Sequence, residues 1–169
     1  MRLRNLILCV AAIGLLSLVG CFATKFTLIA PDTAKVDRAY IGDWDAINAK
    51  GEHASLIIRN IDDGRYYVET HDLDGKNVSR YVGFLASVKN ATFAHVRPLQ
   101  DDGSIPDGWI IMRVELADKK LTLRQLSDDF FKGKPIDSSD QLRQILEANL
   151  DNQQLYANDE TITATRIAK

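Results

Sequence analysis

Histidine, carboxylate and serine side chains are the groups from which this chain could build a catalytic or metal site. Its three histidines are His53, His71 and His95, and none has a second ligand-type residue at the spacing of a metal site. Residues 72–75 lack the further oxygen ligands of a calcium loop. No serine stands in a Gly-x-Ser-x-Gly turn. We therefore predict no metal, no cofactor and no enzymatic activity.

Cys21 is the residue for which the surrounding sequence predicts a definite chemistry. The segment before it has Arg2 and Arg4 at its start and only apolar or small residues from Leu6 to Gly20. This apolar stretch is shorter than the roughly 20 residues that a membrane-spanning helix needs. We therefore interpret residues 1–20 as a secretory signal peptide.

The end of this segment, Leu18-Val19-Gly20-Cys21, resembles the lipobox of bacterial lipoproteins. The resemblance implies cleavage between Gly20 and Cys21, a diacylglycerol on the Cys21 thiol, and a further acyl chain such as palmitate on the new amino terminus. Phe22, rather than aspartate, follows the cysteine, which implies export to the outer membrane, facing the periplasm. The lipid bilayer is then the expected partner of Cys21.

Cysteine and charge content constrain the mature domain. Cys9 leaves with the signal and Cys21 carries lipid, so no disulfide is expected within the domain. Two cations and no acids leave with residues 1–20, which changes the formal charge from −2 to −4. This balance predicts no attraction for nucleic acid or for anionic lipid. We expect residues 21–37 to be the lipidated cysteine and a tether, with 26–30 as an alternative edge strand, and residues 38–169 to form a single β-rich domain.

Short β-type runs separated by turn residues follow this segment and predict an antiparallel all-β domain. Asp-Gly and Lys-Asn pairs supply the turns between several of the runs. The predicted strands are Ala39–Asp45, Ala54–Ile61, Arg65–Thr70, Val78–Val88, Ala91–Arg97, Trp109–Leu116 and Lys119–Leu126.

The run beginning at Trp109 has the clearest alternation, with Ile110, Met112, Val114 and Leu116 on one face. We predict that Ile110, Met112 and Val114 point inward and are the candidate ligand-facing residues. The strand aromatics are either core or the lining of a ligand pocket; they are Trp44, Tyr66, Tyr67, Tyr81, Phe84, Phe93 and Trp109.

One segment has helical rather than strand periodicity. Leu142, Ile145, Leu146 and Leu150 share a stripe, and Ser138 with Gln141 fits a capping box, which together predict a helix at 139–149. A final pair of short strands is expected around residues 154–156 and 161–166.

The segment Tyr40-Ile41-Gly42-Asp43-Trp44 resembles the Gly-x-Trp signature of lipocalins, and the order of strands, helix and last strand is similar to theirs. The resemblance implies a lipocalin-like barrel or half-barrel that is closed at one end by the tryptophan. It also implies a late arginine stacked on that tryptophan, for which Arg124 is the candidate. A further implication is an interior that carries small apolar ligands.

Two functions remain open on these residues. The first is a membrane-anchored interaction or structural module that contacts an envelope protein, which we favour slightly because a packed core needs fewer assumptions. The second is a lipocalin-like binder of a small apolar or amphiphilic molecule. An internal cavity would favour the binder, and an exposed apolar patch would favour the interaction module.

Overall fold

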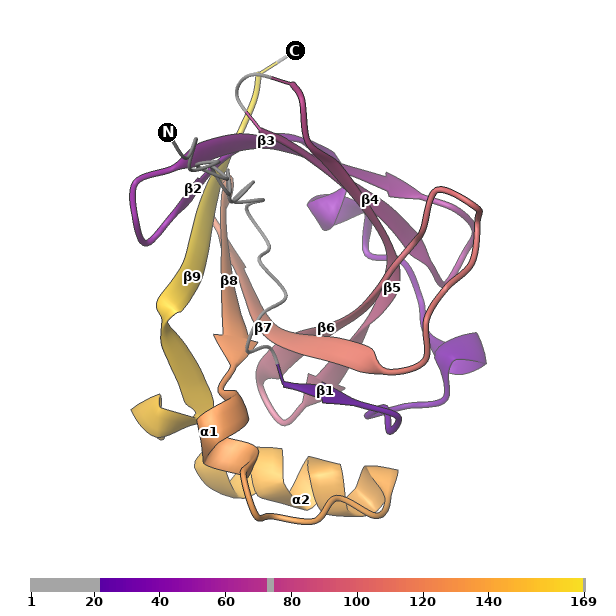
Figure 1. The fold of residues 1–169 in the computed structure, drawn as a ribbon, viewed down its shortest axis with the longest axis vertical. Coiled ribbons are helices and arrows are strands. Elements are labelled where there is room, and N and C mark those ends of the chain that lie inside the picture. Colours follow the sequence, from indigo (N-terminus) through magenta and orange to yellow (C-terminus); the bar gives the residue numbers. More distant parts are fainter. Residues whose placement is uncertain (1–21, 73–74, 169) are drawn as a thin grey trace, which may run out of the picture.

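Eight antiparallel strands, β2 to β9, close into a barrel in this computed structural model, which describes residues 22–72 and 75–168 (Figure 1). Each strand pairs with the next along the chain, and β9 returns to pair with β2. The strands are β1 (Ala23–Thr24), β2 (Gly42–Asn48), β3 (His53–Asn60), β4 (Tyr66–Asp72), β5 (Val78–Val88), β6 (Ala91–Pro98), β7 (Trp109–Ala117), β8 (Lys120–Leu126) and β9 (Tyr156–Arg166). The helices are α1 (Asp128–Phe131) and α2 (Ser139–Asn149), with 3-10 turns η1 (Pro31–Thr33), η2 (Arg38–Tyr40) and η3 (Gln153–Leu155). The predicted antiparallel meander with one main helix is confirmed.

Tight hairpin turns connect β5 to β6 and β7 to β8. Asp118 and Lys119, between β7 and β8, have φ of 48° and 67°, and Lys89, between β5 and β6, has φ of 52°. Positive φ at the central residues gives a turn the same hand of twist as the strands it joins. These local preferences favour a meander of neighbouring strands.

The beginning of the barrel differs from the prediction. The first strand starts at Gly42 rather than Ala39, because Arg38–Tyr40 forms η2. The Asp37 carboxylate caps this turn by accepting a hydrogen bond from the Ala39 amide (2.9 Å). Tyr40 therefore reaches the barrel from a 3-10 turn and not from a strand.

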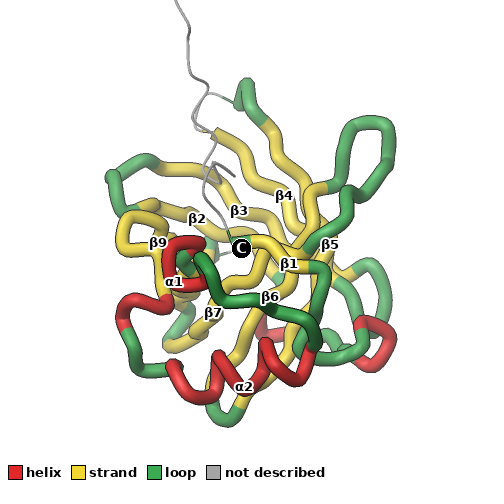
Figure 2. The backbone as a smooth tube through the Cα atoms, turned by 60° about the horizontal axis from the view of Figure 1, so that its bottom comes forward, coloured by secondary structure: helices red, strands yellow, loops and turns green. Residues whose placement is uncertain are grey.

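The outer face of β5, β6 and β7 is covered rather than wet. α2 lies along this side of the barrel, as the two views of the backbone show (Figures 1 and 2). We call the buried residues between α2 and the barrel wall the outer cluster; its main members are Phe22, Leu28, Phe84, Phe93, Trp109, Ile111, Leu142 and Leu146. Both faces of these strands are thus buried, which explains why apolar residues such as Phe84, Phe93 and Ile111 also occupy their outward positions.

The helix predicted at 139–149 is present as α2. The Ser138 hydroxyl accepts from the Gln141 amide (3.1 Å), as expected for a helix cap. The Gln141 side chain accepts from the Asp137 amide (2.8 Å), one residue before the reciprocal position of a capping box. Leu142 and Leu146 are fully buried in the outer cluster.

The predicted final pair of short strands is a single strand of 11 residues, β9. One part of β9 pairs with β8, from Tyr156 opposite Leu126 to Thr165 opposite Lys120. Its later half also pairs with β2 on its other side, which closes the barrel. A register shift between Arg124 and Leu126 lets the long strand follow the curved wall.

Candidate ligand cavity in the barrel

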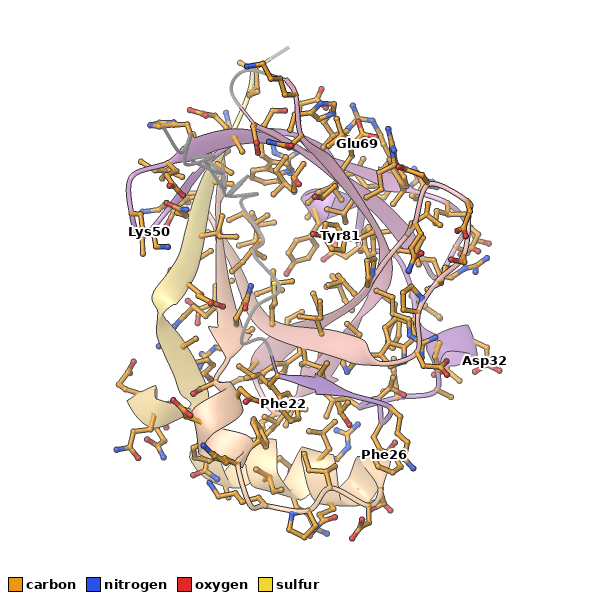
Figure 3. All side chains as sticks on the ribbon, in the orientation of Figure 1. Phe22, Phe26, Asp32, Lys50, Glu69 and Tyr81 are labelled. Atoms are coloured by element: carbon orange, nitrogen blue, oxygen red, sulfur yellow. The ribbon has the colours of Figure 1, made fainter. Side chains whose placement is uncertain are left out.

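A cavity of about 80 Å³ lies inside the barrel. It is several times larger than the roughly 15 Å³ that holds one water molecule. Its wall is built from the inward rows of β3 to β9, together with Tyr40 of η2. The lining includes Leu56, Ile58, Tyr66, Val68, Tyr81, Leu85, Met112, Val114, Leu123 and Ile162. Tyr81 points into this interior (Figure 3).

The cavity surface is apolar, and no charged residue lines it. The Tyr66 hydroxyl accepts from the Asp37 amide (2.5 Å) and donates to the Asp37 carbonyl (3.0 Å). Burial raises the pKa of Tyr66 to about 12, so the phenol stays neutral. Burial, and then the nearby Asp37 carboxylate, raises the pKa of Tyr40.

Gly83 lets β5 and β6 approach each other closely where they line the cavity. A Cβ atom at this position would lie 2.4 Å from the carbonyl oxygen of His95 and 2.9 Å from Cγ1 of Val96. Because the first of these contacts is with backbone, no side-chain rotation would relieve it. Glycine therefore permits the tight curvature of β5 against β6.

The three candidate ligand-facing residues all lie on the inner row of β7. Met112 and Val114 line the cavity. Ile110 is buried beside them in a cluster with Tyr81, Val96 and Met112. The alternate residues Trp109 and Ile111 belong to the outer cluster. Tyr66 and Tyr81, which the sequence placed among the aromatics of either the core or a pocket lining, also line the cavity.

Trp44 is fully buried near the end of the barrel where η2 enters. Its indole nitrogen donates to the Tyr40 carbonyl (3.2 Å). The guanidinium of Arg166 lies 4.2 Å from the ring centre and donates to the carbonyls of Ile41 (2.6 Å) and Ala39. The stacked arginine implied by the lipocalin resemblance is therefore Arg166.

Arg124 was the wrong candidate for this stacking. Its guanidinium lies 3.9 Å from the ring centre of Tyr156, and it donates to Gln153 (2.7 Å). Gln153 lies in η3 and Tyr156 is the first residue of β9. Arg124 is on the outward row of β8, so it cannot reach the indole in the barrel core.

The histidines contact residues of the barrel wall and of the N-terminal segment. His53 lies 3.5 Å from Asp45, and His71 lies 2.5 Å from Glu69, which also accepts from Tyr67 and Arg80. Within residues 22–72 and 75–168, no group of three His, Cys, Asp or Glu side chains could hold a metal ion.

His95 is the buried histidine and holds the N-terminal segment. Its Nε2 accepts from the Leu28 amide (3.2 Å), and its ring stacks on Phe84 with the ring centres 4.7 Å apart. Arg143 of α2 donates to the Leu28 carbonyl. Leu28 is therefore held from both sides, by the barrel and by α2.

Stability should fall as the pH drops from 7 to 5, because His95 cannot take a proton in the folded protein. Burial lowers the pKa of His95 from its ordinary 6.5 to about 3. The unfolded chain therefore binds a proton below pH 6.5 that the folded chain does not, and the cost is about 2 kcal/mol at pH 5. Urea unfolding at several pH values measures this slope.

His95→Gln should flatten the slope between pH 7 and 5, since glutamine does not titrate and still offers an acceptor to Leu28. His53→Gln, at an exposed position, is the matched control. An unchanged slope in His95→Gln would assign the pH dependence to other groups.

No helix in the described part of the chain is long and apolar enough to cross a membrane. Comparison with protein-family models, with curated proteins and with solved structures finds no match for this chain. Assignment of function therefore rests on the barrel and its interior.

Proposed function

We propose that this protein is a lipid-anchored envelope protein whose barrel binds a small apolar molecule, or the slender apolar part of an amphiphile. The observation that carries the proposal is the apolar cavity inside a closed eight-stranded barrel. A barrel of about eight strands has an interior just wide enough for side chains or for one small ligand. Here the inward side chains leave part of that interior empty.

The size and chemistry of the cavity define the ligand class. Its volume of about 80 Å³ is below the roughly 300 Å³ at which pockets for drug-sized ligands begin. A slender group such as an alkyl or isoprenoid chain therefore suits it better than a fused ring system. Since no charged residue lines the wall, a charged group would lose its hydration without gaining a partner. Any charged head group would remain outside the barrel.

The interaction module has weaker support. That function calls for an exposed apolar patch of several hundred Å². Among the described residues, the exposed large hydrophobic side chains are Ile61, Ile105 and Ile167, one each from a turn, a loop and the end after β9. Single exposed isoleucines are ordinary on protein surfaces. The cavity is the more specific feature, so we favour binding without catalysis.

Anchoring through Cys21 remains part of the proposal on the basis of the lipobox resemblance. Cys21 and the signal segment lie outside the described residues. Acyl chains stabilise membrane attachment by about 0.8 kcal/mol per buried CH₂, so the two or three chains of a lipoprotein hold it permanently. A carrier held in this way would work at the surface of the outer membrane that faces the periplasm.

Binding of straight-chain alcohols tests the cavity. Protein freed of bound lipid by organic extraction and refolding should bind primary alcohols with an affinity that rises roughly fourfold per added CH₂ until the cavity is full. Titration calorimetry gives the affinities. Native mass spectrometry before extraction should show a bound mass that extraction removes.

Ala94→Phe should abolish alcohol binding, because Ala94 lines the cavity and a phenyl ring would fill it. Ala117→Phe adds the same volume at an exposed position and should leave binding unchanged. Equal alcohol binding by both variants, or none by the unmodified chain, would contradict a ligand site inside the barrel.

A further inference from the structure

The N-terminal segment packs on the barrel from its first described residue. Phe22 is 7% exposed, and its ring stacks on Phe131 of α1 with the ring centres 3.9 Å apart. The next two residues, Ala23 and Thr24, pair with Ile110 and Trp109 of β7. Figure 3 shows Phe22 and Phe26 on the side of the barrel that carries α1 and α2. Residues 22–24 are therefore fixed to the domain and do not extend from it.

This packing determines how close the domain must lie to its anchor. Cys21 is joined to Phe22 by one peptide bond, which places their Cα atoms about 3.8 Å apart. An acyl chain on Cys21 would therefore enter the bilayer immediately beside Phe22. No free spacer would separate the lipid from the folded domain, so the surface around Phe22 must face the membrane.

Lysines and half-buried apolar side chains gather on that surface. A groove beside Phe22 is lined by Lys25, Phe26, Lys132, Lys134 and Ile136. We call these six residues the anchor-side surface. The three lysines are exposed, and Lys134 Nζ lies 3.4 Å from the ring centre of Phe130. Asp128 is the carboxylate in the groove, and Asp129 follows it in α1.

We propose that the anchor-side surface docks on an anionic lipid bilayer and orients the barrel on it. This inference rests on the proposed anchoring of Cys21, and it is independent of what the barrel binds. Lysine clusters next to a membrane anchor attract anionic head groups, and aromatic side chains favour the same interfacial layer. The domain is acidic overall, and for that reason the sequence predicted no attraction for anionic lipid. The groove itself, however, is lined by three lysines and one carboxylate, Asp128, while Glu160 lies in a neighbouring hollow with Lys132 and Lys134.

A fluorophore at a single introduced cysteine can report the orientation. In the mature protein Cys9 is lost with the signal and Cys21 is acylated, so a new cysteine is the one reactive thiol. Pro135→Cys places an environment-sensitive nitrobenzoxadiazole label between Lys134 and Ile136, at an exposed position. Lys50→Cys is the matched site, and Figure 3 shows Lys50 well away from Phe22.

The acylated protein is reconstituted in vesicles of phosphatidylethanolamine and phosphatidylglycerol. The label at position 135 should shift to blue emission and be quenched by spin-labelled lipid, while the label at position 50 should stay water-like. The shift should weaken at high salt and when phosphatidylcholine replaces phosphatidylglycerol. Water-like emission at both positions, or a shift at position 50 alone, would overturn the proposed orientation.

Charge reversal tests the role of the lysines. Lys25→Glu, Lys132→Glu and Lys134→Glu together should return the label at position 135 to water-like emission. Lys35→Glu, Lys119→Glu and Lys120→Glu are the matched triple, at exposed positions outside the groove. If the first triple leaves the shift unchanged, the surface does not recognise anionic lipid.

The mass of the purified protein reports acylation separately. An unmodified Cys21 would remove the anchor and this inference with it, while alcohol binding by the barrel would stand.

Discussion

Leu146→Asp is expected to lower the free energy of unfolding by more than about 4 kcal/mol. Leu146 is fully buried where α2 packs on the barrel wall. Removing a buried leucine side chain alone costs about 2–5 kcal/mol. The new carboxylate would in addition be buried without a partner, which adds a desolvation cost. Urea unfolding followed by circular dichroism measures the loss.

Gln144→Asp is the matched control, because it adds the same charge to an exposed position of α2. Its effect should stay within about 0.5 kcal/mol, as for most surface substitutions. If Leu146→Asp does not fold, Leu146→Ala should still show a loss of about 2–5 kcal/mol. Leu146 variants as stable as the Gln144 variant would mean that α2 does not pack on the barrel in solution.

The barrel strands and α2 were predictable because their signals are local. Alternation on β7 places Met112 and Val114 on one face, and Asp-Gly or Lys-Asn pairs mark the turns. Ser138 and the leucine stripe identify the start and buried face of α2. Each of these features depends on residues within one helix or one hairpin. A pattern of this kind predicts the elements and their order, and it leaves open whether the barrel closes.

Features that depend on distant residues were not predictable. Closure requires β9 to pair with β2, which brings Arg166 opposite Trp44 across most of the chain. Residues 158–160 separate the two short strands expected from the sequence, yet they continue β9 through the register shift against β8. The sequence predicted that Leu28 belongs to a tether. In the structure its amide donates to Nε2 of His95, which lies far away in the sequence. In each case tertiary pairing overrides the local preference.

Only part of the cavity lining was predictable, because the rest depends on pairing between distant strands. The period of two identifies inward residues on one strand at a time, so Met112 and Val114 could be named. That Tyr66 and Tyr81 share the same interior follows from the pairing of β4 with β5 and from closure. Empty space is the difference between the barrel volume and the volume of its inward side chains, and no single strand contains that information.

Truncation of Trp44 to alanine is expected to cost about 3–5 kcal/mol, the usual range for a large buried aromatic. The indole fills the core, donates to the Tyr40 carbonyl and supports the Arg166 guanidinium. Chemical unfolding measures the loss. The effect should exceed that of Tyr67→Ala, whose ring is half-buried on the outer wall beside Glu69. A smaller loss at Trp44 would mean that the indole does not close this end of the barrel.

Gly42 completes this closure, and its role can be separated from that of the tryptophan. A Cβ atom at position 42 would lie 2.7 Å from a guanidinium nitrogen of Arg166. That guanidinium is held by the carbonyls of Ala39 and Ile41, so it cannot turn away without losing both hydrogen bonds. Gly42→Ala should therefore cost about 1–3 kcal/mol by overpacking.

In an Arg166→Ala background the same substitution should cost much less, because the clash is gone. The double-mutant cycle should give a coupling between the two positions of about 0.5–3 kcal/mol, whereas additive effects would show that glycine is not required there to admit the arginine.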